Sequence, residues 1–228
     1  MSKDGLTATN AKTLDVAQIL QRYRLRAEFR ELSSLEPIGG LYVIPSICST
    51  LIWDGVIFLR QGDFNQGVFK FQLIIPDDYP GATCPRVLFL SQIFHPAIDS
   101  ETNELDLGAI RRQWDSRKYR LYFILRYVKR IFYKVDLCLS GEFPPVNADA
   151  AESYCEDREM FKIKVQGSVR KADEDLYFDN KGSLRFSKWD AVKHDDMKAQ
   201  MITMAESHHA EVQNSQSCGF SWVDNVGG

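Results

Sequence analysis

The sequence predicts an α+β domain, because one helical segment precedes four short β-rich segments and further helical segments follow them. The links between the β-rich segments are short and contain turn residues such as Gly62-Asp63 and Asn65-Gln66-Gly67. A parallel pair of strands would need a crossover of about a dozen residues or more. We therefore expect a four-stranded antiparallel meander with helices packed against it.

The first helix is predicted over Leu14–Leu32, and the turn residues of Pro37-Ile38-Gly39-Gly40 follow it. Charged residues of this segment, Glu28 among them, are expected to fall on the other faces of the helix. Helical spacing places one set of residues on a single apolar face: Val16, Ile19, Leu20, Tyr23 and Ala27.

Alternation in the third β-rich segment predicts a sheet with one buried face. Phe69, Phe71, Leu73 and Ile75 occupy alternate positions, with Lys70 and Gln72 between the first three, which is the period of a half-buried strand. The four predicted strands are Leu41–Pro45, Leu51–Arg60, Val68–Ile75 and Arg86–Leu90.

A central helix is predicted over Tyr119–Tyr133, with Trp114 also buried near it. A further helix is expected over Ala148–Lys171, broken near Glu156 or Gly167. A nearly continuous apolar stripe predicts the central helix: Leu121, Ile124, Leu125, Val128, Ile131 and Phe132.

Length and composition suit one core domain with an extension, since domains typically hold about 100–200 residues and the chain has 228. We predict a flexible N-terminus over residues 1–13, a core over residues 14–171 and a C-terminal extension over residues 172–228. The extension retains apolar anchors, including Trp189 and Trp222, which a simple linker would not need.

Charge and cysteine usage exclude several classes of protein. A net charge of −3 argues against a nucleic-acid-binding protein. No apolar run reaches the roughly 20 residues that span a bilayer, so we expect a soluble cytoplasmic protein. The five cysteines are scattered and fit neither a disulfide framework nor a zinc site. His194, His208 and His209 also lack partners at ligand spacing, and neither a metal nor a cofactor is expected.

An ordered series of motifs lies between Phe71 and Trp114. It comprises Tyr79-Pro80, Pro85-Arg86, His95-Pro96, Leu105-Asp106-Leu107 and Gln113-Trp114. The series resembles the core of the ubiquitin-conjugating enzyme family. The resemblance covers roughly two thirds of the chain and implies that family's fold for Leu14–Lys171.

The resemblance also implies lost chemistry. Active members carry Asn after His-Pro and the nucleophilic Cys before Leu-Asp, and this sequence has Ala97 and Glu104 at those positions. A carboxylate cannot carry a thioester, and a methyl group cannot support an oxyanion. Gly81 stands where active members have an aromatic residue for docking ligases, and Asp115-Ser116-Arg117 replaces a Ser-Pro-Ala loop. The chain is therefore expected not to be an enzyme.

Three residues near these motifs invite a catalytic role. By resemblance, His95 buttresses the His-Pro turn, and Cys84 lies on the ligase-facing side rather than beside the thioester groove. Glu104 has no paired carboxylate nearby beyond Asp106, so we expect it to be a solvated surface residue.

A closer resemblance is carried by four segments, Gly40–Ser46, Arg60–Gly62, Val68–Phe71 and Gly219–Val223. Through them the whole chain most resembles, among inactive members, the Fused toes or AKT-interacting protein group, especially the insect crossbronx-like proteins. This resemblance implies an adaptor that binds Hook-type coiled-coil proteins, in a complex that links endosomal vesicles to dynein, with only indirect membrane association.

Two other classes of function remain open. One is a non-catalytic cofactor that pairs with an active ubiquitin-conjugating enzyme and positions ubiquitin. The other is an active enzyme that uses an unexpected cysteine.

Basic residues concentrate between Arg111 and Lys134, where nine of them stand against the single acid Asp115. Such a run is typical of a solvated helix face, and it also suits an acidic protein partner or an anionic membrane surface. The predicted partner-binding residues are Arg126, Lys129 and Arg130, together with Trp189 and Trp222.

Overall fold

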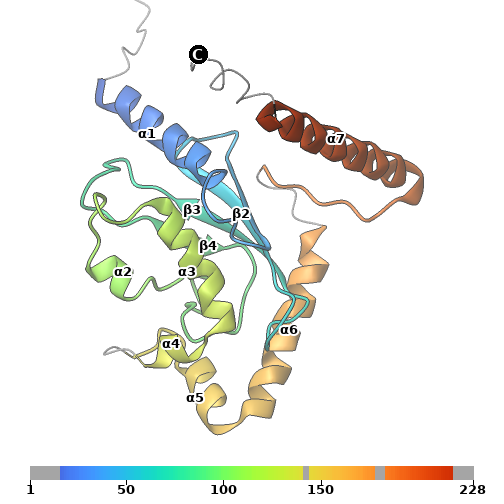
Figure 1. Cartoon of the computed structure of the whole chain (residues 1–228). Helices are drawn as coiled ribbons and strands as arrows, with labels where there is room; N and C mark the ends of the chain where they lie inside the picture. The colour runs from blue at the N-terminus through green and yellow to red at the C-terminus, as the bar shows by residue number, and fades with distance from the viewer. Residues whose placement is uncertain (1–15, 141–143, 178–182, 218–228) are drawn as a thin grey trace, which may run out of the picture. The chain divides into compact units, whose positions relative to one another are not determined.

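Figure 1 shows the protein as a computed structural model, in which residues 16–140, 144–177 and 183–217 are described. The chain forms two compact units, residues 1–186 and 187–228. The first unit contains the sheet and the helices that pack on it. The N-terminal segment 1–13, Cys218 and Trp222 lie outside the described residues.

The order of elements is that of the predicted α+β fold. The helix α1 precedes the sheet and α2 to α6 follow it, whereas α7 belongs to the second unit. The short helices α2 and α4 were not predicted. The elements are α1 (Val16–Leu32), β1 (Leu41–Pro45), β2 (Ile52–Phe58), β3 (Val68–Ile74), β4 (Arg86–Phe89), α2 (Ala109–Arg112), α3 (Leu121–Tyr133), α4 (Asp136–Leu139), α5 (Ala148–Glu156), α6 (Arg158–Leu176) and α7 (Ala191–Ser217).

The sheet is the predicted antiparallel meander in the order β1-β2-β3-β4. Gly55 on β2 pairs with Phe71 on β3, and a Cβ atom at Gly55 would lie 2.3 Å from the Phe71 ring. A larger residue at this position would displace an aromatic side chain from the core. The alternating residues of β3 and the residue after it, from Phe69 to Ile75, are buried as predicted.

The core lies between the sheet and α3, which crosses one face of the sheet in Figure 1. Phe132 of α3 stacks on Phe69 of β3 with ring centroids 5.6 Å apart. The predicted stripe of the central helix is confirmed in full, since its six residues are the six buried residues of α3: Leu121, Ile124, Leu125, Val128, Ile131 and Phe132.

The apolar face predicted for α1 is wrong. Val16, Leu20 and Tyr23 are more than 60% exposed. The helix meets the core through its second half, where Leu25 and Glu28 are buried and Phe29 packs against the core. Glu28 was expected on another face of the helix, and acids are rarely buried unless they are paired.

Glu28 is buried because three donors surround its carboxylate. Tyr79 donates its hydroxyl hydrogen bond at 2.6 Å, Arg24 donates through Nε at 2.9 Å, and the backbone N–H of Leu121 donates at 3.1 Å. Leu121 is the first residue of α3, and no side chain of the preceding Arg120 caps that helix. Glu28 therefore supplies an acceptor to the start of α3 from a distant element.

The outer face of the sheet carries two buried charges that the chain's own later residues satisfy. Lys70 donates through Nζ to the carbonyl of Leu176 at 3.0 Å and lies over the Phe186 ring. Asp54 accepts from the backbone N–H of Ser183 at 2.9 Å. Burial alone would raise the pKa of Asp54, but the hydrogen bonds from Ser183 and Gln72 outweigh it and lower the pKa. This face is therefore partly covered rather than open, contrary to the one-sided sheet predicted from β3.

The predicted break in the late helix is confirmed next to Glu156, because Asp157 separates α5 from α6 and its side chain accepts from the backbone N–H of Met160. The helix continues through Gly167 and ends at Leu176, past the boundary predicted at Lys171. Ala172 and Leu176 are buried.

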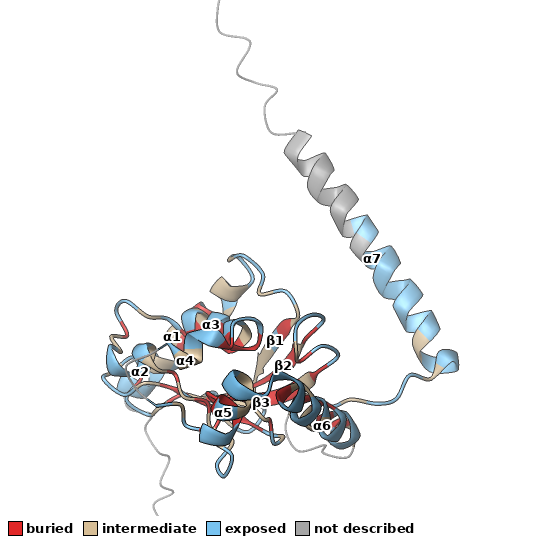
Figure 2. Cartoon of the chain, turned by 90° about the horizontal axis from the view of Figure 1, so that it is seen from below, coloured by how far each residue is buried: buried red, intermediate tan, exposed pale blue. Residues whose placement is uncertain are grey.

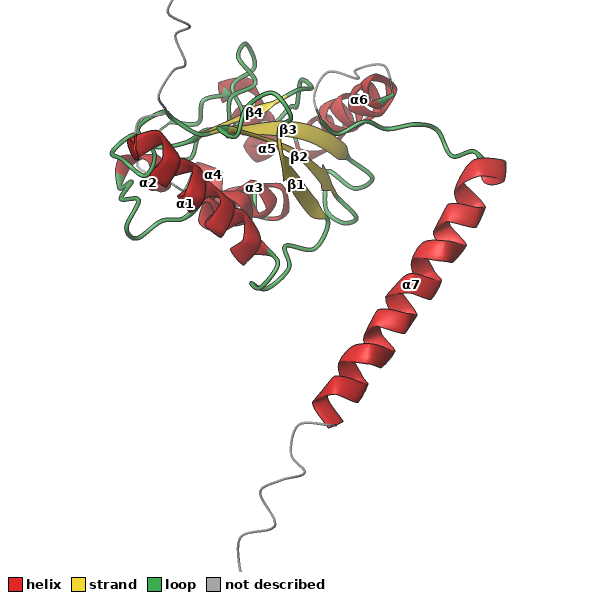
Figure 3. Cartoon of the chain, turned by 90° about the horizontal axis from the view of Figure 1, so that it is seen from above, coloured by secondary structure: helices red, strands yellow, loops and turns green. Residues whose placement is uncertain are grey.

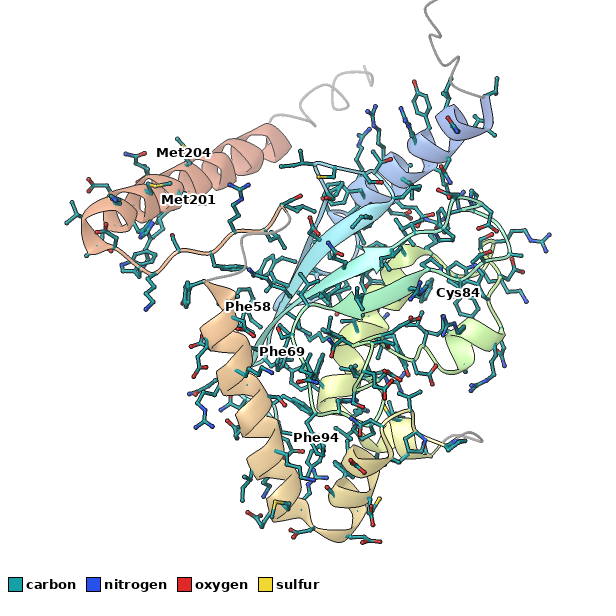
Figure 4. All side chains as sticks on the ribbon, turned by 180° about the vertical axis from the view of Figure 1, so that it is seen from behind. Phe58, Phe69, Cys84, Phe94, Met201 and Met204 are labelled. Carbon is teal, nitrogen blue, oxygen red and sulfur yellow. The ribbon has the colours of Figure 1, made fainter. Side chains whose placement is uncertain are left out.

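The second unit is described through Trp189 and α7. Trp189 is exposed and its ring contacts that of His194, with centroids 5.1 Å apart. The described residues of α7 are mainly coloured as exposed in Figure 2, and the side chains of Met201 and Met204 project from this helix in Figure 4.

Truncating Ile124 or Phe132 to Ala should lower the free energy of unfolding by about 2–5 kcal/mol, because each change leaves a cavity in the packed core. Urea denaturation of the purified protein measures this. Phe123 on the same helix is 43% exposed and serves as the matched control, for which we expect a loss below about 1 kcal/mol. Equal losses at buried and exposed positions would contradict the assignment of the core face.

Candidate functional site

The segment that contains Glu104 runs along β4. The backbone N–H of Leu105 donates to the carbonyl of Val87 at 2.9 Å, and that of Phe89 donates to the carbonyl of Asn103 at 3.0 Å. This pairing places Glu104 beside the strand that carries Arg86.

Glu104 sits between two arginines and is not the solvated surface residue that the sequence predicted. Arg86 approaches one carboxylate oxygen at 2.5 Å, and Arg111 of α2 approaches the other at 3.0 Å. The Glu104 side chain is only 18% exposed. The hydrogen bond from Arg86 is the main cause that lowers the pKa of the Glu104 carboxyl, so the group stays ionised.

Ala97 and His95 form a turn whose polar groups are satisfied internally. Nδ1 of His95 accepts from the backbone N–H of Ala97 at 3.0 Å, and Nε2 lies 3.2 Å from the carbonyl of Ile131. This pattern fits a neutral imidazole with the proton on Nε2. Burial lowers the pKa of His95 to about 4. A fully buried, doubly bonded imidazole locks Pro96 and the turn against α3 and leaves no nitrogen for proton transfer.

The thiols near these motifs are not activated. Burial raises the pKa of Cys84 to about 11, and Arg111 opposes that rise only in part. Burial likewise raises the pKa of Cys138 to about 11. Since the thiolate is the nucleophilic form, neither residue has the electrostatics of a catalytic cysteine. Cys84 lies in the loop before β4 in Figure 4.

The Tyr79-Pro80 loop is held from two sides. Tyr79 donates to Glu28, and the carbonyl of Pro80 accepts from the hydroxyl of Ser116 at 3.1 Å. A Cβ atom added at Gly81 would lie 2.4 Å from the backbone carbonyl oxygen of Asp78. The loop therefore has no room for a larger side chain at Gly81 without moving.

Trp114 is half-buried rather than buried as predicted. Its ring stacks on Tyr119 with centroids 6.1 Å apart, and its Nε1 has no hydrogen-bond partner within the described residues. The indole packs against the edge of the core and leaves part of the ring exposed.

The predicted partner-binding residues fall into separate regions. Arg126, Lys129 and Arg130 lie together on α3 and line one groove. Trp189 belongs to the second unit, and Trp222 lies outside the described residues.

Sequence reasoning missed the roles of three residues in these sites. Glu28 meets Leu121 from 93 residues away, and Arg86 and Arg111 meet Glu104 from 18 and 7 residues away. The sequence alone offers only a weak signal for such contacts. For Glu28, that signal is an acid at a helical position that could face the core.

Neither a metal nor a membrane span is found in the described ranges. In residues 16–140, 144–177 and 183–217, no three His, Cys, Asp or Glu side chains gather as metal ligands would. No helix in these ranges has the length and apolar character to cross a membrane.

Comparison with known proteins places this geometry in a family. Residues 24–169 match the family described as Ubiquitin-conjugating enzyme. The chain is 38% identical over 208 residues to the AKT-interacting protein of Salmo salar, covering 88% of this chain and 67% of that protein. It is 35% identical over 223 residues to the AKT-interacting protein homolog A of Xenopus laevis, covering 96% of this chain and 74% of that protein.

A solved structure shares the fold. The ubiquitin-conjugating enzyme domain from Toxoplasma gondii superposes with a TM-score of 0.53 at 21% identity, covering 65% of this chain and 96% of that domain. At this identity the likeness concerns the fold alone. These findings agree with the motifs between Phe71 and Trp114.

His95 should make stability depend on pH. Its pKa is about 4 when folded and about 6.5 when unfolded, so its contribution is fully present above pH 6.5 and is lost as pH falls toward 4. Between pH 7 and pH 5 we expect this residue alone to lower the free energy of unfolding by about 2 kcal/mol. Urea denaturation at both pH values measures the change, and His95→Gln should lessen it by that amount. An unchanged difference in His95→Gln would show that other groups cause it.

Proposed function

Because this chain belongs to the ubiquitin-conjugating enzyme family, and within it to the AKT-interacting proteins, we propose that it is a catalytically inactive member that acts as a protein-interaction adaptor. The observation that carries this proposal is the ion-paired Glu104 at the position that, by family resemblance, corresponds to the nucleophilic cysteine.

The chemistry of the site supports inactivity. A carboxylate held by Arg86 and Arg111 cannot form the thioester that this family uses. Ala97 presents a methyl group where active members place an amide that supports the oxyanion. Cys84 and Cys138 offer no replacement, since burial raises both of their pKa values.

The Tyr79-Pro80 loop supports the loss of ligase docking. Gly81 stands where active members have an aromatic residue, and the surrounding backbone leaves no space for one. Loss of such an anchor removes the type of buried contact that dominates interface energies.

If the fold is retained and thioester formation is lost, protein binding is the function that remains. The relatives' names record an interaction with AKT, which supports protein partners for this chain too. By resemblance, we propose Hook-type coiled-coil proteins as partners, in a complex that serves endosomal vesicle trafficking with dynein. The protein would then be cytoplasmic and peripheral to endosomes through its partners.

The alternative is a non-catalytic cofactor of an active ubiquitin-conjugating enzyme in polyubiquitin chain formation. Such a role would require binding of ubiquitin or of the enzyme. No specific contact within the described residues favours this alternative over the adaptor.

The purified protein should form no thiol-sensitive adduct when incubated with activating enzyme, ATP and ubiquitin, because Glu104 cannot carry a thioester. Non-reducing electrophoresis detects such an adduct, and an active conjugating enzyme serves as the positive control. A ubiquitin band that disappears on adding thiol would overturn the proposed inactivity.

The double variant Glu104→Cys, Ala97→Asn extends this experiment. Even if it accepts ubiquitin, its ligase-stimulated discharge should be about 30-fold or more below that of an active enzyme, since the docking anchor at Gly81 is absent. Discharge at the rate of an active enzyme would show that ligase docking has been retained.

Removal of residues 187–228 should reduce the set of bound proteins while the first unit stays folded. The cut leaves Phe186 over Lys70 and Ser183 on Asp54, so the outer sheet face keeps its cover. Affinity isolation with quantitative mass spectrometry compares the truncated and intact chains, and Trp189→Ala tests one exposed anchor. If the truncated chain retains every partner at the same yield, binding does not use the extension.

A further inference from the structure

Four cations on the outer side of α3 and just past its end have no acidic partner among the described residues. Arg126, Lys129, Arg130 and Lys134 form no ion pair within the described residues. Other basic residues of the same region are neutralised locally, as when Arg120 pairs with Glu31. Arg126, Lys129 and Arg130 recur at helical spacing and so lie on one side of α3, and Lys134 follows directly after the helix and lines the same hollow.

These cations line a hollow, which we call the α3 groove. It lies between α3 and the turn that precedes β1, and its volume is about 660 Å³. Among the described residues that line it, Glu36 is the single acid. Figure 3 shows α3 and the segment that leads into β1 on the same side of the sheet. The Lys129 amine approaches that turn closely enough that a Cβ atom at Gly39 would lie 3.7 Å from Nζ.

Aromatic rings form much of the wall. Arg126 lies over the Tyr122 ring at 5.7 Å, and Lys129 lies over the Tyr133 ring at 5.9 Å. Phe123 is 43% exposed and Tyr133 is 40% exposed. The groove therefore offers apolar contact area together with positive charge, and cation–π contacts orient two of its cations.

The shape and the aromatic wall discriminate among anionic partners. A membrane surface contacts cations that protrude, whereas these cations line a concave groove. Nucleic acid is disfavoured by the net charge of −3, which repels an extended polyanion beyond the groove. A peptide can place carboxylates on the cations and insert apolar side chains between the rings.

We propose that the α3 groove binds an acidic peptide segment of a partner protein, one that also carries aromatic or aliphatic side chains. This inference rests on the proposed adaptor function and assigns the chemistry of one docking surface. The exposed cations mainly accelerate encounter, and the aromatic wall slows dissociation.

The test uses a fluorescein-labelled random copolymer of glutamate and tyrosine, with polyglutamate of the same length for comparison. Fluorescence anisotropy should show that the copolymer binds the full chain more tightly than polyglutamate does. Simultaneous Arg126→Glu, Lys129→Glu and Arg130→Glu changes should weaken copolymer binding by about tenfold or more.

A matched triple reversal controls for net charge. Arg22→Glu, Arg26→Glu and Arg30→Glu alter exposed residues of α1 and produce the same change in total charge. This control should stay within about twofold of the parent chain. An equal loss in both triple variants would overturn the proposal, because it would indicate a response to overall charge alone.

The aromatic wall is tested separately. Phe123→Ala should weaken binding of the copolymer and leave polyglutamate binding unchanged, with Tyr23→Ala on α1 as the exposed aromatic control. Equal affinity for the copolymer and polyglutamate would overturn the apolar part of the proposal. Tighter binding of phosphatidylserine vesicles or of oligouridylate, sensitive to the α3 triple variant, would assign the groove to lipid or nucleic acid instead.

These outcomes are independent of the inactivity assay. A thiol-sensitive ubiquitin adduct would refute the proposed function whatever the copolymer does. A chain that forms no adduct and whose copolymer binding ignores the α3 variants would refute only the groove assignment.

Discussion

The buried carboxylate of Glu28 is the constraint on which the arrangement of the first unit depends. A carboxylate removed from water costs several kcal/mol unless donors replace its hydration. Here Arg24, Tyr79 and Leu121 each donate one hydrogen bond to it, from α1, from the loop before β4 and from the start of α3. Burial and the bond to Glu28 raise the pKa of Tyr79, so its hydroxyl remains a donor. Removing any one of the three elements would leave the charge incompletely satisfied, which makes their positions mutually dependent.

Glu104, near the other end of the motif region, differs from Glu28 because its carboxylate is not fully buried. Its carboxylate remains near the surface, and the two guanidinium groups that hold it are about half exposed. Solvent screens such a pair, so its contribution to stability is small. Its effect is geometric, because it joins β4 to the short helix α2 across the position where the family resemblance places the nucleophile. The two acids thus act differently: Glu28 organises the fold, and Glu104 fixes a surface.

The spacing of apolar residues correctly predicted the elements that have one dominant buried face. The alternation from Phe69 to Ile75 and the stripe of α3 were confirmed because a single dominant apolar face decides each element. The contacting face of α1 could not be predicted in this way. Its first half carries apolar residues that remain exposed, while an acid lies on the face that packs. The ion pairs of Glu104 escaped prediction for a related reason: they join segments whose proximity only the folded sheet establishes.

The chain itself covers the inner face of the sheet and part of the outer face. The outer side of α3 is therefore the more available surface for a partner. The inner face packs on α3. On the outer face Ser183 donates to Asp54, and Lys70 donates to the carbonyl of Leu176 and lies over the Phe186 ring. A helix that buries one side in a core must leave the other side in solvent, where charge is inexpensive to keep. A run of basic residues is itself typical of a solvated helix face. The cations on the outer side of α3 differ in that they have no ion-pair partner among the described residues and line a hollow, in a chain whose net charge is −3. Such a separation of charge creates a local positive potential that the negative net charge of the whole chain does not reveal. A field of this kind steers acidic partners to one surface.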